Sequence, residues 1–188
     1  MLRRLWLLTL SLTLLGAQAA SATMIANGGF ESGSFSDWTV VKGSTNNSYV
    51  NVRAYLPHSG TYEATFAATG DDDDAIWQTV TTTAGQWYSF DFWLKHDTTD
   101  PDNDFSAKWD GNTVLDLVNA GGFGWTEYQY TVRASSSATT VQFSGRDPLA
   151  YYRLDDVSVT PVPEPSALAL LAVLGVAAST LLRRQSQS

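Results

Sequence analysis

A strict alternation of apolar and polar residues in the middle of the chain constrains its fold more than any other feature. Apolar residues take every second position of the segment 87–95, namely Tyr88, Phe90, Phe92 and Leu94. The positions between them hold Ser89, Asp91, Trp93 and Lys95. Successive side chains of an extended strand point to opposite sides, so this pattern predicts a β-strand with one buried face. No part of the middle of the chain shows a sustained 3.6-residue period, which argues against helices there.

Other segments with strand character follow along the chain. They are Tyr49–Arg53, Thr61–Ala67, Ala75–Val80, Phe105–Trp109, Thr113–Leu117, Trp125–Val132, Thr139–Ser144 and Tyr151–Val159. The turn residues Asp110-Gly111-Asn112 between two of these segments predict a hairpin. About nine or ten short strands separated by Gly, Asn, Asp and Thr predict an all-β protein, an antiparallel β-sandwich of the jelly-roll type.

The N-terminal residues 1–22 have the features of a secretory signal peptide. Arg3 and Arg4 precede the apolar run Leu5–Leu15, and small-x-small cleavage sites end at Ala19 and Ala22. The chain has no cysteine, so an exported domain must be stable without disulfides. The lack of cysteine also excludes thiolate metal sites and cysteine nucleophiles.

The C-terminal residues 161–188 contain a different kind of export signal. Pro163-Glu164-Pro165 is followed by an apolar run of seventeen residues, 166–182, and then by Arg183 and Arg184. The run has the minimum length for a transmembrane helix, and the positive-inside rule places the arginine pair in the cytoplasm. The prolines keep their segment extended and accessible to a processing enzyme. An ordinary membrane anchor with a proline-rich stalk is the alternative.

This tail resembles the PEP-CTERM sorting signal in the order and position of its motif, helix and basic end. The resemblance implies processing by exosortase, a membrane protease-transpeptidase of Gram-negative bacteria that produce exopolysaccharide. The protein would be held briefly in the inner membrane and would then reach the cell surface or the extracellular matrix.

The intervening residues 23–160 also resemble a known class of domain. Asn27-Gly28-Gly29-Phe30-Glu31, followed by Trp38, opens the domain, and the segment 154–159 (Leu-Asp-Asp-Val-Ser-Val) closes it. Both segments are similar to the galactose-binding-like jelly rolls, which include carbohydrate-binding modules that bind xylan and glucans. These are framework residues, so they imply the fold and say little about the ligand.

The two ends of this domain contain candidate ligands for a metal ion. In a regular last strand, Asp155 would share a side with Val157 and Val159, and a buried carboxylate needs a partner. The resemblance implies one structural calcium ion, with Glu31 and Asp155 as ligands and Asp156 as substitute if a bulge shifts the register. The alternative is that Asp155 accepts backbone N–H groups and that Glu31 is solvated.

Sugar rings are bound by aromatic faces together with polar groups that contact the hydroxyls. Trp93, beside Asp91 and Lys95 on the polar side of its strand, is the strongest candidate, and Arg146 lies on the polar side of its own strand. The weaker candidates are Trp77, Trp87 and Tyr152. The remaining tryptophans of the domain are expected in the core: Trp38, Trp109 and Trp125.

Charge and the histidines bear on the class of function. Residues 23–161 contain seven Lys/Arg and eighteen Asp/Glu, a formal charge of −11 that argues against nucleic acid and favours cations or neutral sugars. His58 and His96 have no recognisable triad setting, and nothing selects a carboxylate pair for catalysis. We therefore expect a non-catalytic, exported protein that binds exopolysaccharide or biofilm. The alternatives are a structural matrix or floc protein without a defined glycan, and a secreted glycoside hydrolase.

Overall fold

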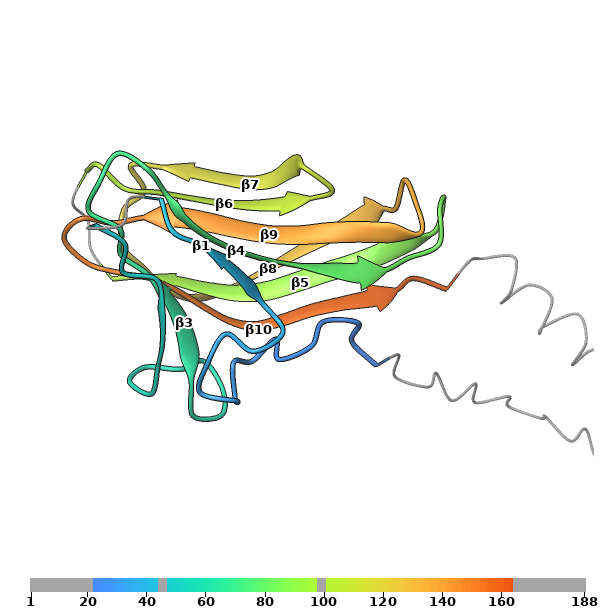
Figure 1. Ribbon diagram of the computed structural model, residues 1–188, viewed down its shortest axis with the longest axis horizontal. Coiled ribbons are helices and arrows are strands. Elements are labelled where there is room, and N and C mark those ends of the chain that lie inside the picture. Colours follow the sequence, from blue (N-terminus) through green and yellow to red (C-terminus); the bar gives the residue numbers. More distant parts are fainter. Residues whose placement is uncertain (1–21, 44–46, 98–100, 164–188) are drawn as a thin grey trace, which may run out of the picture.

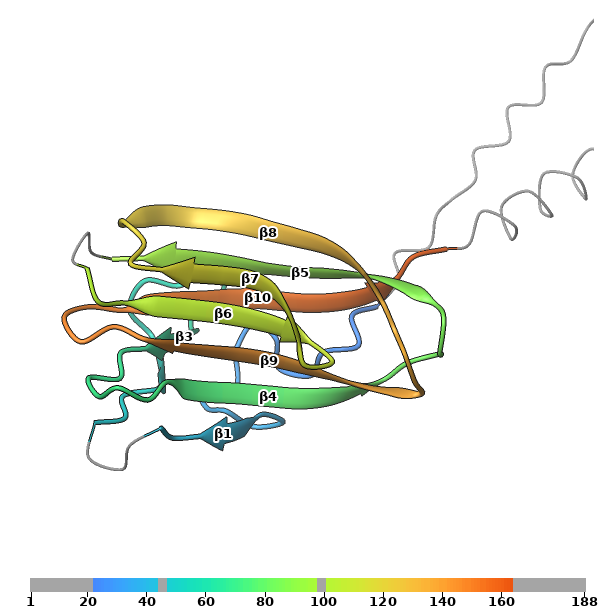
Figure 2. The same cartoon turned by 90° about the horizontal axis from the view of Figure 1, so that it is seen from above.

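Ten β-strands arranged in two antiparallel sheets make up the computed structural model, which describes residues 22–43, 47–97 and 101–163 (Figure 1). The first sheet has the order β1 (Thr39–Val41), β4 (Asp74–Thr81), β9 (Ala138–Arg146), β6 (Asp104–Trp109) and β7 (Asn112–Val118). The second has the order β2 (Asn51–Arg53), β3 (Glu63–Phe66), β10 (Tyr152–Pro161), β5 (Trp87–His96) and β8 (Phe123–Arg133). Seen from two directions, the sheets form two layers (Figures 1 and 2).

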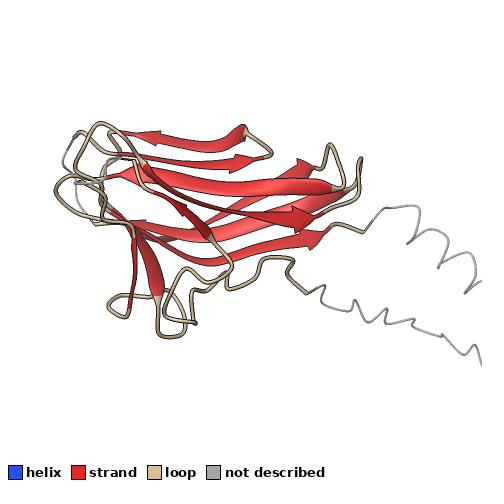
Figure 3. Cartoon of the chain, in the orientation of Figure 1, coloured by secondary structure: helices blue, strands red, loops and turns tan. Residues whose placement is uncertain are grey.

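The expected all-β sandwich is confirmed, and no helix occurs in the described ranges (Figure 3). Each of the nine predicted segments overlaps one strand, from β2 to β10. The predicted hairpin joins β6 to β7, and its turn residues Asp110 and Gly111 have φ angles of 50° and 77°. Two consecutive positive φ angles are typical of the tight turn that matches the twist of paired strands. The strand β1 was not among the predicted segments.

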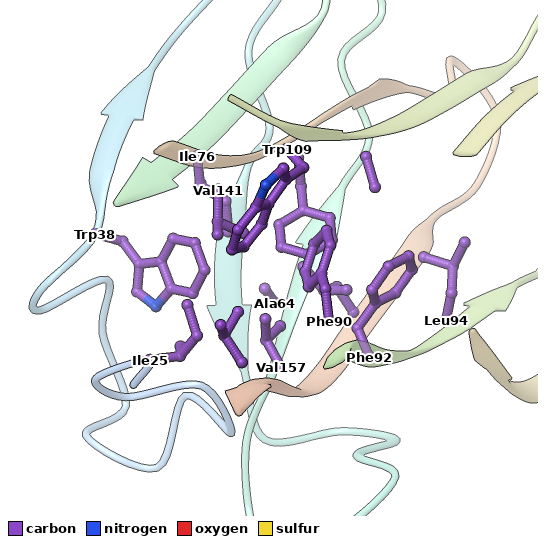
Figure 4. Packing of buried hydrophobic residues seen from close by; sticks show 14 of the residues in the cluster. Ile25, Trp38, Ala64, Ile76, Phe90, Phe92, Leu94, Trp109, Val141 and Val157 are labelled. Atoms are coloured by element: carbon purple, nitrogen blue, oxygen red, sulfur yellow. The ribbon is translucent and has the colours of Figure 1, made fainter. Parts of the chain in front are cut away.

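The core lies between the two sheets and contains the apolar side of β5. Tyr88, Phe90, Phe92 and Leu94 are 3% exposed or less, as the alternation predicts. Figure 4 shows Phe90 pointing from β5 toward Trp109 of the opposite sheet, and the centroids of the two rings are 6.0 Å apart. Every residue of this buried cluster lies between Ile25 and Val159, so a protein of residues 22–163 retains the whole core and can fold by itself.

The last strand departs from the expected regular alternation. Asp155 is paired with Trp93 and Ser158 with Asp91, so β10 contains one extra residue between these pairs. Asp156, in this bulge, has a φ of 48°. The condition of a regular strand is therefore not met, and Asp155 does not share a side with Val157 and Val159, because a bulge reverses the direction of the side chains that follow it.

The opening segment packs closely against this bulge. The N–H of Val157 donates to the carbonyl of Gly28 over 3.0 Å, and a Cβ at residue 28 would lie 2.1 Å from the carbonyl oxygen of Val157. Only glycine allows the two backbones to come this close. The first glycine of the N-G-G-F-E motif thus joins the beginning of the domain to its last strand.

The two processing segments predicted from the sequence fall outside the described residues, apart from Ala22 at the N-terminal side and 161–163 at the C-terminal side. Within the described part of the chain, no helix is long and apolar enough to cross a membrane. The sorting motif residues Glu164 and Pro165, the apolar run 166–182 and the pair Arg183-Arg184 also lie outside it.

Candidate ligand-binding faces

A row of three neighbouring side chains crosses the outer face of the first sheet. Trp77 of β4 is paired with Gln142 of β9, which is paired in turn with Lys108 of β6. All three are half-buried and point away from the core, because the residues that flank them in their strands are buried. In the part of the chain that the structure describes, none of these side chains makes a hydrogen bond or an ion pair. We call this surface the Trp77 face.

A second group of polar residues continues the Trp77 face toward one end of the sheet. The hydroxyls of Ser106 and Ser144 are 2.9 Å apart. Beyond them, the Arg146 guanidinium donates to Asp104 over 2.7 Å and to Asp102 over 2.6 Å. These pairs hold Arg146 in place, and the hydrogen bonds to two carboxylates raise its pKa further.

Asp73 lies beside this group and shares a hydrogen bond with Asp104. Burial, and then the neighbouring Asp104 carboxyl, raise the pKa of Asp73 to about 7, although the cations Arg146 and Lys108 act in the opposite direction. Two adjacent carboxyls ionise together only at a high electrostatic cost, so the pair holds one proton near neutral pH. This proton reduces the negative charge of the Trp77 face.

The outer face of the second sheet contains the predicted ligand residues Trp93, Asp91 and Lys95, and here Trp93 is covered. The His58 ring stacks on the Trp93 ring with centroids 3.8 Å apart and planes 13° apart. His58 is held there by Asp156, whose carboxylate lies 2.7 Å from Nδ1. One side of the indole is thus occupied by the protein's own side chain.

The polar members of this predicted set also have partners within the protein. Asp91 accepts a hydrogen bond from Ser89 over 3.0 Å, and Lys95 forms an ion pair with Asp97. Arg146 belongs to the first sheet, on the opposite side of the sandwich from Trp93. The structure thus brings Trp93, Asp91 and Lys95 together but separates Arg146 from them.

The burial of the remaining aromatic side chains tests where each was predicted to lie. Trp38 and Trp109 are in the core, 6% and 3% exposed, as predicted. Trp125 was expected in the core but is half-buried on the outside, with its ring edge-on to His58 at 5.6 Å. Tyr152, a weaker candidate for ligand contact, is completely buried and stacks on His96.

The candidate calcium ligands Glu31, Asp155 and Asp156 all bind one loop, the segment 58–62. Asp155 is completely buried and accepts the backbone N–H groups of His58 and Ser59 over 2.9 and 3.1 Å. Glu31 accepts the backbone N–H groups of Thr61 and Tyr62, and Asp156 accepts the Ser59 hydroxyl over 2.7 Å. The three carboxylates therefore fasten this loop to the two ends of the domain.

These contacts fit a hydrogen-bonded clamp better than a cation site. Both carboxylate oxygens of Glu31 and of Asp155 point at N–H donors, which a cation would have to displace. In the described residues, no three acidic or histidine side chains converge as metal ligands do. Burial raises the pKa of Asp155 to about 6 even though three backbone N–H groups favour the ionised form. The structural calcium ion stays a prediction.

The sequence alone did not indicate Lys108 of the Trp77 face or the nearby Asp73, and it made Trp77 only a weaker candidate. The alternation in β4 contains the missing signal for Trp77, because Ile76 and Val80 are buried and Trp77 lies between them. No comparable local signal exists for Asp73, whose partner Asp104 is 31 residues away in the chain.

Comparison with known proteins identifies the fold. No family model matches the chain, and no curated protein matches it. Among solved structures, TmCBM61 in complex with β-1,4-galactotriose has a TM-score of 0.57 at 20% identity, over 76% of this chain and 100% of the other. The CBM22-1 xylan-binding domain of Paenibacillus barcinonensis Xyn10C has a TM-score of 0.55 at 16% identity, over 79% and 99%.

Another xylan-binding domain of CBM family 22 has a TM-score of 0.54 at 17% identity and covers 74% of this chain and 96% of its own. In each case nearly the whole of the known module is matched, so the similarity extends over a complete domain. Identities of 16–20% show a common fold and do not transfer a ligand. The described part of the chain has the jelly-roll fold of carbohydrate-binding modules.

Proposed function

We propose that this protein is an exported, non-catalytic module that binds polysaccharide on the Trp77 face. The observation that carries the proposal is the row Trp77–Gln142–Lys108, an aromatic ring beside an amide and an ammonium group that make no hydrogen bond or ion pair in the described structure. The carbohydrate-binding modules that share the fold support the same reading.

The chemistry of the row suits a sugar. An indole covers the apolar C–H side of a pyranose ring, and amide and ammonium groups bind its hydroxyls. Neighbouring strands are about 5 Å apart, so the three side chains can contact one or two adjacent sugar units. The shared proton of Asp73 and Asp104 limits the repulsion of a weakly acidic chain at this face.

Asp73 and Asp104 do not have the geometry of the catalytic pair of a glycoside hydrolase. Glycosidases use two carboxyls about 5–9.5 Å apart, with the scissile bond between them. Asp73 and Asp104 share a hydrogen bond, which leaves no room between them for a sugar oxygen or a water molecule. The two carboxyls therefore cannot serve as the acid and base of a glycosidase.

The experiment is to replace Trp77 by alanine in a protein of residues 22–163. Loss of one stacked indole should weaken binding by about 1–3 kcal/mol, which is about 5- to 150-fold in affinity. Retention in affinity gels containing xylan, β-1,4-galactan or exopolysaccharide from the producing bacterium would measure it.

Trp87→Ala is the matched control, because Trp87 is also a partly exposed indole, 48% exposed, and lies on the second sheet. Its retention should equal that of the wild type. If Trp77→Ala is retained as strongly as Trp87→Ala while the wild type binds, the site is elsewhere. If the wild type is retained by none of the polysaccharides and only cations aggregate it, the protein is a structural matrix protein.

We further propose the route by which the module reaches its ligand. Residues 1–22 direct export, and exosortase recognises Pro163-Glu164-Pro165 and removes the apolar run with Arg183 and Arg184. The module would then be released from the inner membrane to the cell surface or biofilm matrix. Detection of the protein in the matrix of the wild-type bacterium, and its loss from the matrix in an exosortase deletion, tests this route.

A further inference from the structure

The strand β8 is a long and regular sheet edge. It has eleven residues, Phe123–Arg133, and in the described part of the chain no strand pairs with its outer side (Figure 2). Its pairing with β5 is regular from Arg133 to Thr126. Such an edge presents a row of unpaired N–H and C=O groups that can pair with another strand.

The other three edges of the sandwich are less suited to pairing. The edge strands β1 and β2 have three residues each, and the pairing of β7 with β6 is interrupted by a bulge. Short edges and bulges are the usual features that keep sheets from joining. The strand β8 has neither feature over its length from residue 126, and it contains no proline or lysine.

The charge of β8 also differs from that of the rest of the protein. The whole chain has a formal charge of −8, whereas β8 contains one glutamate and one arginine and is neutral. Glu127 is exposed and has no hydrogen bond or ion pair in the described residues. Two copies of this strand can therefore approach each other without the repulsion that the remaining acidic surface would produce.

The positions of these two charges define one register. If β8 pairs antiparallel with a second β8 about Tyr130, Glu127 lies opposite Arg133 of the second copy, and this pair occurs twice. Glu127 is paired with Trp93 and Arg133 with Trp87, so both side chains point to the outer face of the sheet and can meet there. Opposite charges on directly opposed residues stabilise a strand pair.

We propose that the protein forms a symmetric dimer through β8, which joins the two five-stranded second sheets into one continuous sheet. The inner side of β8 supports this. Tyr128 and Tyr130 stack on Phe92 at 5.5 and 6.2 Å but remain half-buried at the open edge of the sandwich. In this register Tyr130 meets Tyr130 and Tyr128 meets Val132 of the other copy, which covers their exposed sides. The interface has two-fold symmetry, as most homodimers do.

The dimer leaves the Trp77 face open, because that face belongs to the other sheet. The proposal does not depend on the proposed polysaccharide ligand. Where that ligand is bound, two sites in one particle would increase retention on a polymer by multivalency.

Sedimentation equilibrium of the residues 22–163 at a series of protein concentrations tests the proposal. The wild type should change from monomer to dimer as its concentration rises. Glu127→Arg should weaken the dimer about tenfold at low salt, because two opposite-charge pairs become two like-charge pairs. Arg133→Glu should weaken it similarly, and the double variant Glu127→Arg/Arg133→Glu should restore most of the wild-type affinity.

Asp71→Arg is the matched control, because it makes the same change of charge at an exposed loop residue far from β8 in the sequence. It should leave the dimer unchanged or strengthen it slightly. Arg133 also donates to the Gly85 carbonyl over 2.8 Å, so melting curves must show that Arg133→Glu is folded. Glu127→Arg removes no hydrogen bond of the described structure. A wild type that is monomeric at all concentrations, or a double variant as weak as the single ones, would overturn the proposal.

Discussion

Replacing Trp93 by alanine tests whether the ligand binds the outer face of the first or of the second sheet, and whether Trp93 belongs to the core. Trp93 and Phe92 are neighbours in β5, but Phe92 is completely buried against Phe143, Phe90 and Tyr128, whereas Trp93 is half-buried on the outside. Phe92→Ala should cost about 3–5 kcal/mol of unfolding free energy, the usual cost of emptying an aromatic site in a core. Trp93→Ala loses the stack on His58 and part of its buried area, and it should cost about 1–2 kcal/mol.

Urea denaturation of the wild type and of both variants measures these costs, and affinity gels measure polysaccharide retention of the folded ones. If the ligand binds the Trp77 face, Trp93→Ala should be retained as the wild type is. A folded Trp93→Ala protein that is no longer retained would move the site to the second sheet. A Trp93→Ala protein that loses as much stability as Phe92→Ala would show that Trp93 is a core residue.

Three further predictions concern protons, calcium and the tail. Because folding raises the pKa of Asp73 from 3.8 to about 7, its contribution to stability is present at low pH and is lost as the pH rises through 7. The urea midpoint of the wild type should therefore fall as the pH rises from about 4 to 7, and Asp73→Asn should flatten this fall; equal slopes would contradict the assignment. If calcium binds the clamp, calcium at a hundredfold excess over its dissociation constant stabilises the folded form by about 2.7 kcal/mol, and Asp155→Asn abolishes the effect. Identical melting curves in calcium and in EDTA would exclude such a site. Intact mass spectrometry of the secreted protein should find it without Arg183 and Arg184, and an exosortase deletion should leave both in a membrane-bound form.

The strands could be predicted because their signal is local. In β5 the apolar positions alternate without interruption, and the structure buries each of them. A bulge near Asp155 was named as an alternative, but the sequence could not decide for it, because Asp155 and Asp156 are followed by an ordinary alternation and only the pairing with β5 reveals the extra residue. The direction of the Asp155 side chain follows from that one residue.

The candidate site was harder to predict, because periodicity tells the two sides of a strand apart but not which sheet the strand joins. Trp93 and Arg146 both point outward, as their strands predict, and yet they lie on opposite sheets. The stack of His58 on Trp93 joins residues 35 positions apart and has no counterpart in any local pattern. Strand order and long-range contacts of this kind decide which tryptophan is open to a ligand.

The closeness of the two ends of the domain has a mechanical consequence. The N–H of Met24 donates to the carbonyl of Val159 over 2.8 Å, and Val162 is hydrogen-bonded to Trp87, so the described chain enters and leaves at the same end of the sandwich (Figure 1). A force applied at Pro163 acts along β10, which lies between β3 and β5. The hydrogen bonds of an antiparallel pair are perpendicular to the strands, so such a force shears many bonds at once and does not open them one by one. A polymer held on the Trp77 face would pull on the first sheet, whereas Pro163 follows β10 of the second sheet. The tension would then pass through the aromatic layer between the two sheets, where Phe90 and Phe92 of β5 pack against Phe143 of β9.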